Sequence, residues 1–309
     1  MIPLYVIIPI LPEGGFPMDQ TYVFMTDSDS DLPFHLKEQY DIPVVYMPYA
    51  LDGKEYFDDL GQMLDHKSYY DMMRNGAAPV TSALNEASYF EYFEPILKDG
   101  KDLLFVAFSS KLSCTLQAVY SAREKLLEQY PGRKFIVVDT LRISGPQTLL
   151  VLKAHEMYRA GKSIEDVAEW LEANKLRAQA YFIVDDLKYL KRGGRISATA
   201  ATVGTMLDLK PIISEAADGT LTANDKIRGR KKAIAFIVDK MLEYAPDPAE
   251  SPLIVLNADS IEDAERTKAL VEQKLPGANV MVENVGPVIG AHAGPGTIAL
   301  CFIGSKPLA

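Results

Sequence analysis

The feature that most constrains the fold of this 309-residue chain is a set of short apolar runs that do not alternate with polar residues. The clearest are residues 103–109, 134–140 and 180–186, and residues 21–27 form another. A strand with one wet face alternates, whereas an unbroken apolar run is typical of a strand buried on both faces. Residues 42–50 indicate a further strand. The pattern predicts a mostly parallel sheet covered by helices.

Amphipathic segments separate these runs and predict the covering helices. Residues 113–130 place one apolar stripe at helical spacing, with charged residues off it. The stripe consists of Leu116, Val119, Tyr120, Leu126 and Leu127. Residues 163–166 and 260–263 each have the sequence of a capping box that opens a helix. Alternating strands and helices of this kind predict an α/β domain.

The second half differs, because a Gly-rich basic turn at 190–197 and an Ala/Thr-rich helix interrupt the pattern. Residues 218–227 begin with a turn signal and then alternate, which predicts antiparallel pairing with the strand at 210–214. Further predicted elements are helices at 229–244 and 261–274 and strands at 252–257, 278–285 and 297–303. We therefore predict a smaller C-terminal α+β domain. The expected division is an N-terminal extension over 1–20, an α/β domain over 21–170 and the α+β domain over 171–309.

Composition narrows the chemistry. The chain carries 42 acidic and 32 basic side chains, a net charge of −10, which argues against nucleic acid as a partner. Two cysteines, Cys114 and Cys301, provide no disulfide framework, so a cytoplasmic location is expected. The sequence contains no phosphate-binding P-loop, nucleophile elbow or dinucleotide fingerprint.

No metal site is expected. The four histidines are scattered and form no H-E-x-x-H motif. Asp27, Asp29 and Asp31 resemble the start of a calcium loop, but the loop's glycine and distal glutamate are missing. The apolar residues 2–11 are too few to span a bilayer and include prolines, so they indicate either an extension or a short surface strand. No stable membrane span is expected, and transient membrane contact stays open.

Three hydroxyl-rich turns, at 26–33, 81–82 and 109–115, are expected at the carboxyl ends of strands. Such turns either cap helices or together form a site for an anion or a hydroxyl group. His292 lies among small residues in 285–296, where close approach to a ligand is sterically easy. The other histidines, His35, His66 and His155, are predicted to be surface residues.

Two basic islands stand out on this acidic chain. One contains Arg192 and Arg195, and the other contains Lys226, Arg228, Arg230, Lys231 and Lys232. Each is interpreted either as a solvated face or as a docking surface for an acidic partner.

These motifs, in this order, resemble the DegV family, whose members are the fatty-acid-binding subunits of bacterial fatty acid kinase. The resemblance covers residues 21–304. It rests on TDSDSDLP at 26–33, TS at 81–82, SSKLSCT at 109–115, FIVDDLKYLKRGGRIS at 182–197, the KPII and DGTL segments, and GPVIGAHAGPG at 286–296.

The resemblance implies a two-domain protein that buries one acyl chain in a tunnel between its domains, with no cofactor and no catalysis of its own. It implies that Ser113 and a hydroxyl of Thr81 or Ser82 bind the carboxylate, with His292 nearby. A partner kinase would then use ATP to form an acyl-phosphate for phospholipid synthesis. Arg192 and Arg195 would face that kinase.

Some positions depart from the family pattern. Lys111 and Cys114 stand where glycine is usual, Ala83-Leu84-Asn85 replaces the usual Gln-Pro-Ser, and LRISGPQ at 141–147 is unusual. These departures affect the expected acyl specificity more than lipid binding itself. Two alternatives remain beside the carrier: a small-ligand sensor or interaction protein that uses the basic islands, and a hydrolase that uses Ser113 and His292.

Overall fold

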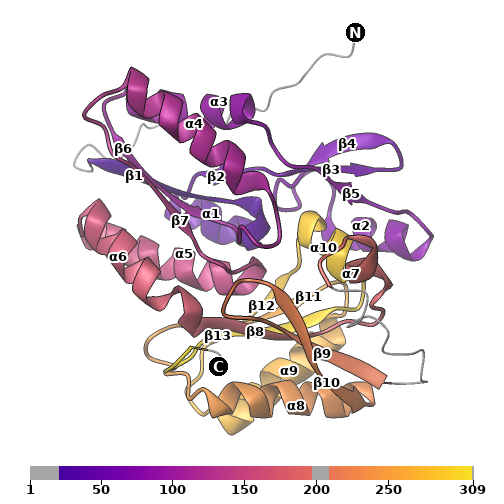
Figure 1. Cartoon of the computed structure of the whole chain (residues 1–309). Coiled ribbons are helices and arrows are strands. Elements are labelled where there is room, and N and C mark those ends of the chain that lie inside the picture. The colour runs from indigo at the N-terminus through magenta and orange to yellow at the C-terminus, as the bar shows by residue number, and fades with distance from the viewer. Residues whose placement is uncertain (1–20, 197–208, 308–309) are drawn as a thin grey trace.

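The computed structural model of the chain describes residues 21–196 and 209–307 (Figure 1). The predicted extension over 1–20 and most of the predicted Ala/Thr-rich helix after residue 197 lie outside these residues. Within the described part, no helix combines the length and the apolar character that crossing a bilayer requires.

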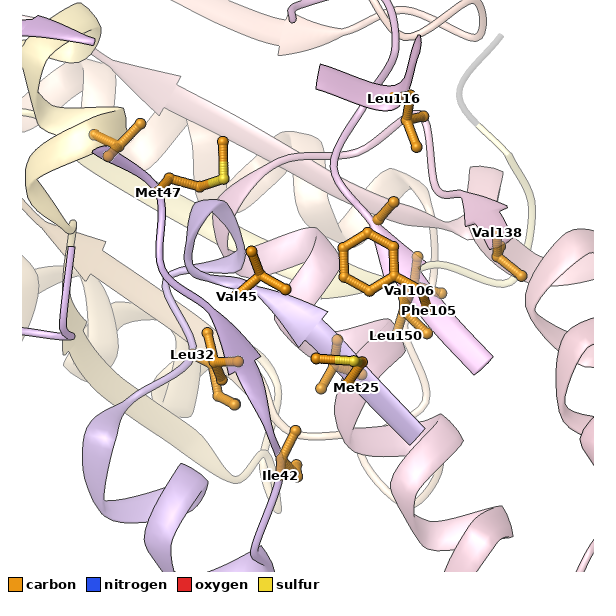
Figure 2. Close-up of a cluster of buried hydrophobic side chains, with 14 of the residues drawn as sticks. Met25, Leu32, Ile42, Val45, Met47, Phe105, Val106, Leu116, Val138 and Leu150 are labelled. Atoms are coloured by element: carbon orange, nitrogen blue, oxygen red, sulfur yellow. The ribbon is translucent and has the colours of Figure 1, made fainter. Parts of the chain in front are cut away.

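The first sheet is parallel throughout and has the strand order β2-β1-β6-β7. Its strands are β1 (Tyr22–Asp27), β2 (Val44–Val45), β6 (Asp102–Ala107) and β7 (Phe135–Asp139). Every residue of β1 is buried, as are five of the six residues of β6. Figure 2 shows Met25 of β1, its sheet neighbour Phe105 of β6, and Leu150 from the helix at 144–159, all of which belong to the buried core. The predicted parallel sheet is confirmed, since two-sided burial explains the unbroken apolar runs.

Helices cover both faces of this sheet. On one face lie α3 (Glu86–Lys98) and α4 (Thr115–Gln129), and on the other lie α5 (Ser144–Arg159) and α6 (Ile164–Asn174). The short α1 (Phe34–Tyr40) joins β1 to β2. The predicted stripe of α4 is wrong at Tyr120, whose side chain is 42% exposed. Ala122 is buried instead, because it lies one turn from Val119 on the face toward the sheet.

The prediction of a single strand at 42–50 is wrong. The chain leaves the parallel sheet after β2 and enters a second sheet as β3 (Pro48–Leu51). There β3 pairs antiparallel with β4 (Lys54–Phe57) and β5 (Val80–Thr81). Between these two strands, α2 (His66–Arg74) begins after Asp65, whose carboxylate accepts the Ser68 N–H.

The third sheet is mixed and has the order β10-β9-β8-β13-β11-β12. It contains β8 (Ala178–Ile183), β9 (Leu209–Glu215), β10 (Leu221–Arg228), β11 (Leu253–Asn257), β12 (Val280–Asn284) and β13 (Ile298–Ile303). The predicted antiparallel pairing of 218–227 is confirmed, because β10 pairs antiparallel with β9. Helices α8 (Arg230–Glu243) and α9 (Ile261–Lys274) cover its outer face (Figure 1).

Strand β8 shows why an unbroken apolar run does not by itself mean parallel pairing. Both of its neighbours, β9 and β13, are antiparallel to it. It is nevertheless buried on both faces, because α5 packs on one side and α8 on the other. Helix α5 thus lies between the parallel sheet and the mixed sheet and contacts strands of both. The division into domains at residues 170 and 171 stays a prediction.

The two predicted capping boxes differ. At α6, the Ser163 hydroxyl accepts the Asp166 N–H and the Asp166 carboxylate accepts the Ser163 N–H, so this box is confirmed. At α9 the prediction is wrong. The Ser260 hydroxyl donates to the Thr297 carbonyl, and the Asp263 carboxylate forms ion pairs with Arg230 and Arg266.

Candidate functional site

A cavity of about 250 Å³ lies between the N-terminal elements and the inner face of the mixed sheet. Its floor follows alternate residues, Thr297 just before β13 and Ala299 and Cys301 within it, with Ala180 and Phe182 of β8 beside the last two. Alternate residues share one face of a strand, so the floor is a straight, mostly apolar track. Most of the remaining lining is also apolar.

Two of the predicted site residues meet at one end of this cavity. The Thr81 hydroxyl lies 2.9 Å from His292 Nε2. Thr81 ends β5, and His292 belongs to α10 (Pro287–Ala293), so the pair joins the two halves of the chain. Burial, and then the charges of Arg195 and Arg192, lower the pKa of His292 to about 4, so its ring is neutral at physiological pH.

The surroundings of His292 decide which way this hydrogen bond runs. Among the residues that the structure describes, its Nδ1 is buried without a hydrogen-bond partner, and it lies against the backbone of Gly193. A proton on Nδ1 would be a buried donor with nothing to bind, which is costly. The favoured tautomer therefore carries its proton on Nε2 and donates to the Thr81 oxygen. The Thr81 O–H is then free to donate into the cavity.

Ser113 and Ser82 also line the cavity, near the start of α4 and after β5. The Ser113 hydroxyl donates to Thr115 Oγ1 at 2.8 Å and accepts the Thr115 N–H at 3.2 Å. The Ser82 side chain is exposed. Cys114, beside Ser113, is exposed at the cavity and is the residue before the first turn of α4.

The two predicted docking arginines have different environments. Arg195 lines the cavity, and its Nε donates to the Leu112 carbonyl at 3.0 Å. Arg192, at the end of α7 (Lys188–Arg192), is exposed and lies 5.4 Å from the ring centre of Tyr189. Arg195 therefore supplies positive charge inside the site, while only Arg192 faces solvent.

Besides the contact of Thr81 with His292, three hydrogen bonds tie the start of α10 and the two residues before it to the N-terminal half. The Tyr69 hydroxyl donates to the Pro287 carbonyl at 2.7 Å, and the Tyr70 hydroxyl donates to the Val285 carbonyl at 2.8 Å. The Gly286 N–H donates to the Asp31 carboxylate at 2.8 Å. These bonds fix the helix that carries His292 against the elements that carry Thr81.

The prediction that the other histidines lie on the surface holds only for His35, which is exposed. His155 is buried and stacks on Tyr40 with ring centres 4.8 Å apart. His66 is half-buried over Gly61. Both predictions are wrong because residues from other segments cover these rings, Tyr40 of α1 for His155 and the turn at Gly61 for His66, and helical spacing does not reveal such contacts.

Four buried carboxyl groups, which composition alone does not reveal, surround this region: Asp27, Asp29, Asp31 and Asp58. Burial raises the pKa of Asp27 to about 6 and that of Asp31 to about 7. Burial also raises the pKa of Asp29 and Asp58 well above the ordinary range, and the neighbouring carboxylates add to both shifts. The positive charge of Arg195 acts against the raised pKa of Asp29, and Asp29 itself lines the cavity.

The cluster gives stability an unusual pH dependence. Since these folded-state pKa values lie above those of the unfolded chain, the folded protein binds more protons, and stability must fall as pH rises. We expect the melting temperature to be higher at pH 6 than at pH 8, where Asp27 and Asp31 are forced to ionise. Asp58→Asn, which stays neutral throughout, should flatten this slope. A melting temperature that rises between pH 6 and pH 8 would contradict the expectation.

The geometry does not form a hydrolase triad. His292 Nε2 faces Thr81 rather than Ser113, and its Nδ1 has no partner among the described residues. A serine hydrolase needs its histidine bonded to the nucleophile and oriented by an acid. The hydroxyls here can bind a ligand, but they are not arranged to attack one.

Comparison with known proteins agrees with this fold. A sequence profile described as an uncharacterised protein of the DegV family matches residues 22–305. The chain belongs to the DegV family. It is 38% identical over 283 residues to a DegV domain-containing protein of Clostridium perfringens, covering 92% of this chain and 97% of that one.

Two solved DegV structures show the same fold. A DegV family protein from Thermus thermophilus, described for its fatty acid binding, has a TM-score of 0.81 and 29% identity and covers 92% of this chain and 100% of its own. DegV of Bacillus subtilis, a fatty acid binding protein, has a TM-score of 0.78 and 27% identity and covers 93% and 100%.

Proposed function

We propose that this protein binds a fatty acid in the cavity and presents its carboxylate to a separate ATP-dependent kinase, which forms an acyl-phosphate. The observation that carries the proposal is the single apolar track of β13 with uncharged hydroxyl donors at one end. The DegV proteins of Thermus thermophilus and Bacillus subtilis, both described as fatty acid binding, support the lipid part of it.

The apolar track supplies most of the affinity. At about 0.8 kcal/mol per buried CH₂, a chain of roughly fifteen methylenes contributes about 12 kcal/mol before the costs of binding. The polar end therefore need not hold the carboxylate in a closed ion pair. The Thr81 hydroxyl can bind it, and so can the Ser113 hydroxyl once it turns from Thr115 Oγ1 toward the ligand, while one carboxylate oxygen stays free to attack a phosphate.

The carboxylate end also lies close to solvent, which a kinase needs. Ser82, Cys114 and Arg192 are exposed around it. We assign Thr81, Ser82, Ser113 and His292 to the carboxylate, and Arg192 to the kinase contact. Arg195 is better placed to offset the carboxylate charge than to contact a partner, since it lines the cavity.

Binding is tested by denaturing extraction and mass spectrometry of the purified protein, followed by titration of the delipidated protein with stearate. We expect one fatty acid per chain. Thr81→Val and Ser113→Ala should each weaken stearate binding about tenfold or more, because each removes a hydrogen bond to a charged group. Ser110→Ala is the matched control, because this exposed serine lies outside the cavity lining. If no fatty acid is extracted or taken up, a sensor of other ligands becomes the better reading.

The kinase step needs its own experiment. With a fatty acid kinase, ATP and loaded protein, Arg192→Glu should lower acyl-phosphate formation while leaving stearate affinity unchanged. If the variant and the unmodified protein support acyl-phosphate formation equally well, Arg192 does not contribute to the contact with the kinase.

A further inference from the structure

The cavity has a second polar group away from His292, because Glu215 of β9 lines it. Its side chain is 1% exposed to solvent, and its carboxyl group accepts the N–H groups of Ile143 and Ala180, which also line the cavity. A buried carboxyl group beside an alkyl chain is a poor match, and it therefore calls for a functional explanation.

The strand pairings separate Glu215 from His292 along the cavity. Near His292, the Thr297 hydroxyl donates to the Ala293 carbonyl at 3.0 Å, which places Thr297 beside the helix of His292. Farther along, Cys301 pairs with Ala180, whose N–H donates to Glu215 Oε2 at 3.2 Å. Thr297 and Cys301 are four positions apart in sequence, which is about 13 Å of extended strand. This distance corresponds to the middle of an extended long acyl chain.

The carboxyl group of Glu215 has unused hydrogen-bonding capacity. Oε1 accepts the Ile143 N–H at 3.2 Å, and Oε2 accepts the Ala180 N–H at 3.2 Å. A carboxylate has about four acceptor sites, so the described residues leave about two of them unfilled. Burial raises the pKa of Glu215 to about 7, and the nearby charge of Arg142 opposes that shift. The group can thus accept a hydrogen bond from a ligand, and its neutral form can donate one.

We propose that Glu215 is a specificity-determining residue that makes this cavity select fatty acids with a hydroxyl group in mid-chain. The inference rests on the proposed fatty acid binding. A methylene beside Glu215 leaves its free acceptor sites unpaired, whereas a hydroxyl fills one of them. Sites built around a buried hydrogen-bonding group discriminate strongly against ligands that lack the matching group.

The first test uses the unaltered protein, delipidated and titrated with stearate, with mid-chain hydroxystearate and with stearate hydroxylated next to the carboxylate. We expect mid-chain hydroxystearate to bind about tenfold more tightly than stearate, the ratio that one hydrogen bond to a buried carboxyl group supplies. The third ligand is the matched control, because its hydroxyl lies at the Thr81 end. Equal or weaker binding of mid-chain hydroxystearate overturns the proposal.

The second test assigns the preference to Glu215. Glu215→Met removes the carboxyl group while keeping a flexible side chain of similar length, and it should reverse the preference in favour of stearate. Glu215→Gln keeps an acceptor and should keep the preference. An unchanged preference in Glu215→Met overturns the assignment, and if that variant does not fold, the ligand series on the unaltered protein still decides. If no fatty acid binds at all, the proposed function fails; if stearate binds as tightly as its mid-chain hydroxyl analogue, only this inference fails.

Discussion

Replacing Arg142 with leucine is expected to lower the free energy of unfolding by about 3 kcal/mol or more, the range for breaking a buried polar network. The guanidinium is fully buried. It donates to the carbonyls of Ala178 at 2.6 Å, Leu141 at 2.7 Å and Ala216 at 3.1 Å, which belong to three separate segments. Leucine removes all three bonds, and although the Ala216 carbonyl still accepts the Gly219 N–H, the buried Ala178 carbonyl loses its arginine donor. Urea denaturation followed by circular dichroism measures the loss.

The loss should be larger at pH 8 than at pH 5. Glu215 ionises in this range, and Arg142 is the charge that stabilises its anionic form. Arg159→Leu is the matched control, because this arginine is exposed at the end of α5, the helix that follows Arg142 in the chain. It should change stability by less than about 0.5 kcal/mol. An Arg142→Leu protein as stable as Arg159→Leu would show that the carbonyls find other partners.

Replacing Gly193 with alanine is expected to weaken fatty acid binding about tenfold or more without unfolding the protein. The backbone of Gly193 has φ −73°, which any residue adopts, so the effect is purely steric. An added Cβ would lie 2.0 Å from His292 Nδ1. The ring must move, and its 2.9 Å contact with Thr81 is lost. Titration of the delipidated protein with stearate gives the change in affinity.

Two comparisons isolate the cause. Gly194→Ala strains a backbone with φ +70° but meets no atom within 4 Å, so it should cost stability and leave stearate affinity intact. In a His292→Ala background, Gly193→Ala should have no further effect on affinity, since the clashing ring is absent. Additive losses in the double variant would mean that Gly193 acts on the ligand by another route.

The parallel sheet could be predicted because a strand buried on both faces has an unbroken apolar sequence, as β6 does. The division of residues 42–50 between two sheets was not. It depends on which distant segment each half meets: Thr26 pairs with Val44, while Tyr49 pairs with Thr81. Local apolar character is the same on both sides of that break, so periodicity could not locate it.

The site was predictable only in part. The family motifs indicated Thr81, Ser113 and His292, and the structure brings all three to one cavity; their roles stay predictions. The sequence-based prediction did not include Glu215, because the KPIIS segment at 210–214 indicates only a strand and ends one residue before it. Alternation along that strand places Glu215 on the same face as the buried Ile213, which was a usable signal. The sequence around Asp58 does not indicate that its side chain is buried, because the loop that covers it, at Gly286, is far away in the sequence.

The pairing of Thr81 with His292 has a consequence for how the protein responds to being loaded. Its two members lie 211 residues apart in sequence and belong to opposite halves, held together by the Tyr69 and Tyr70 hydroxyls. Neither half alone carries both Thr81 and His292, or both walls of the apolar track. Under the proposed function, a fatty acid contacts both halves at once, and because it binds only their joined form it would raise the free energy needed to separate them.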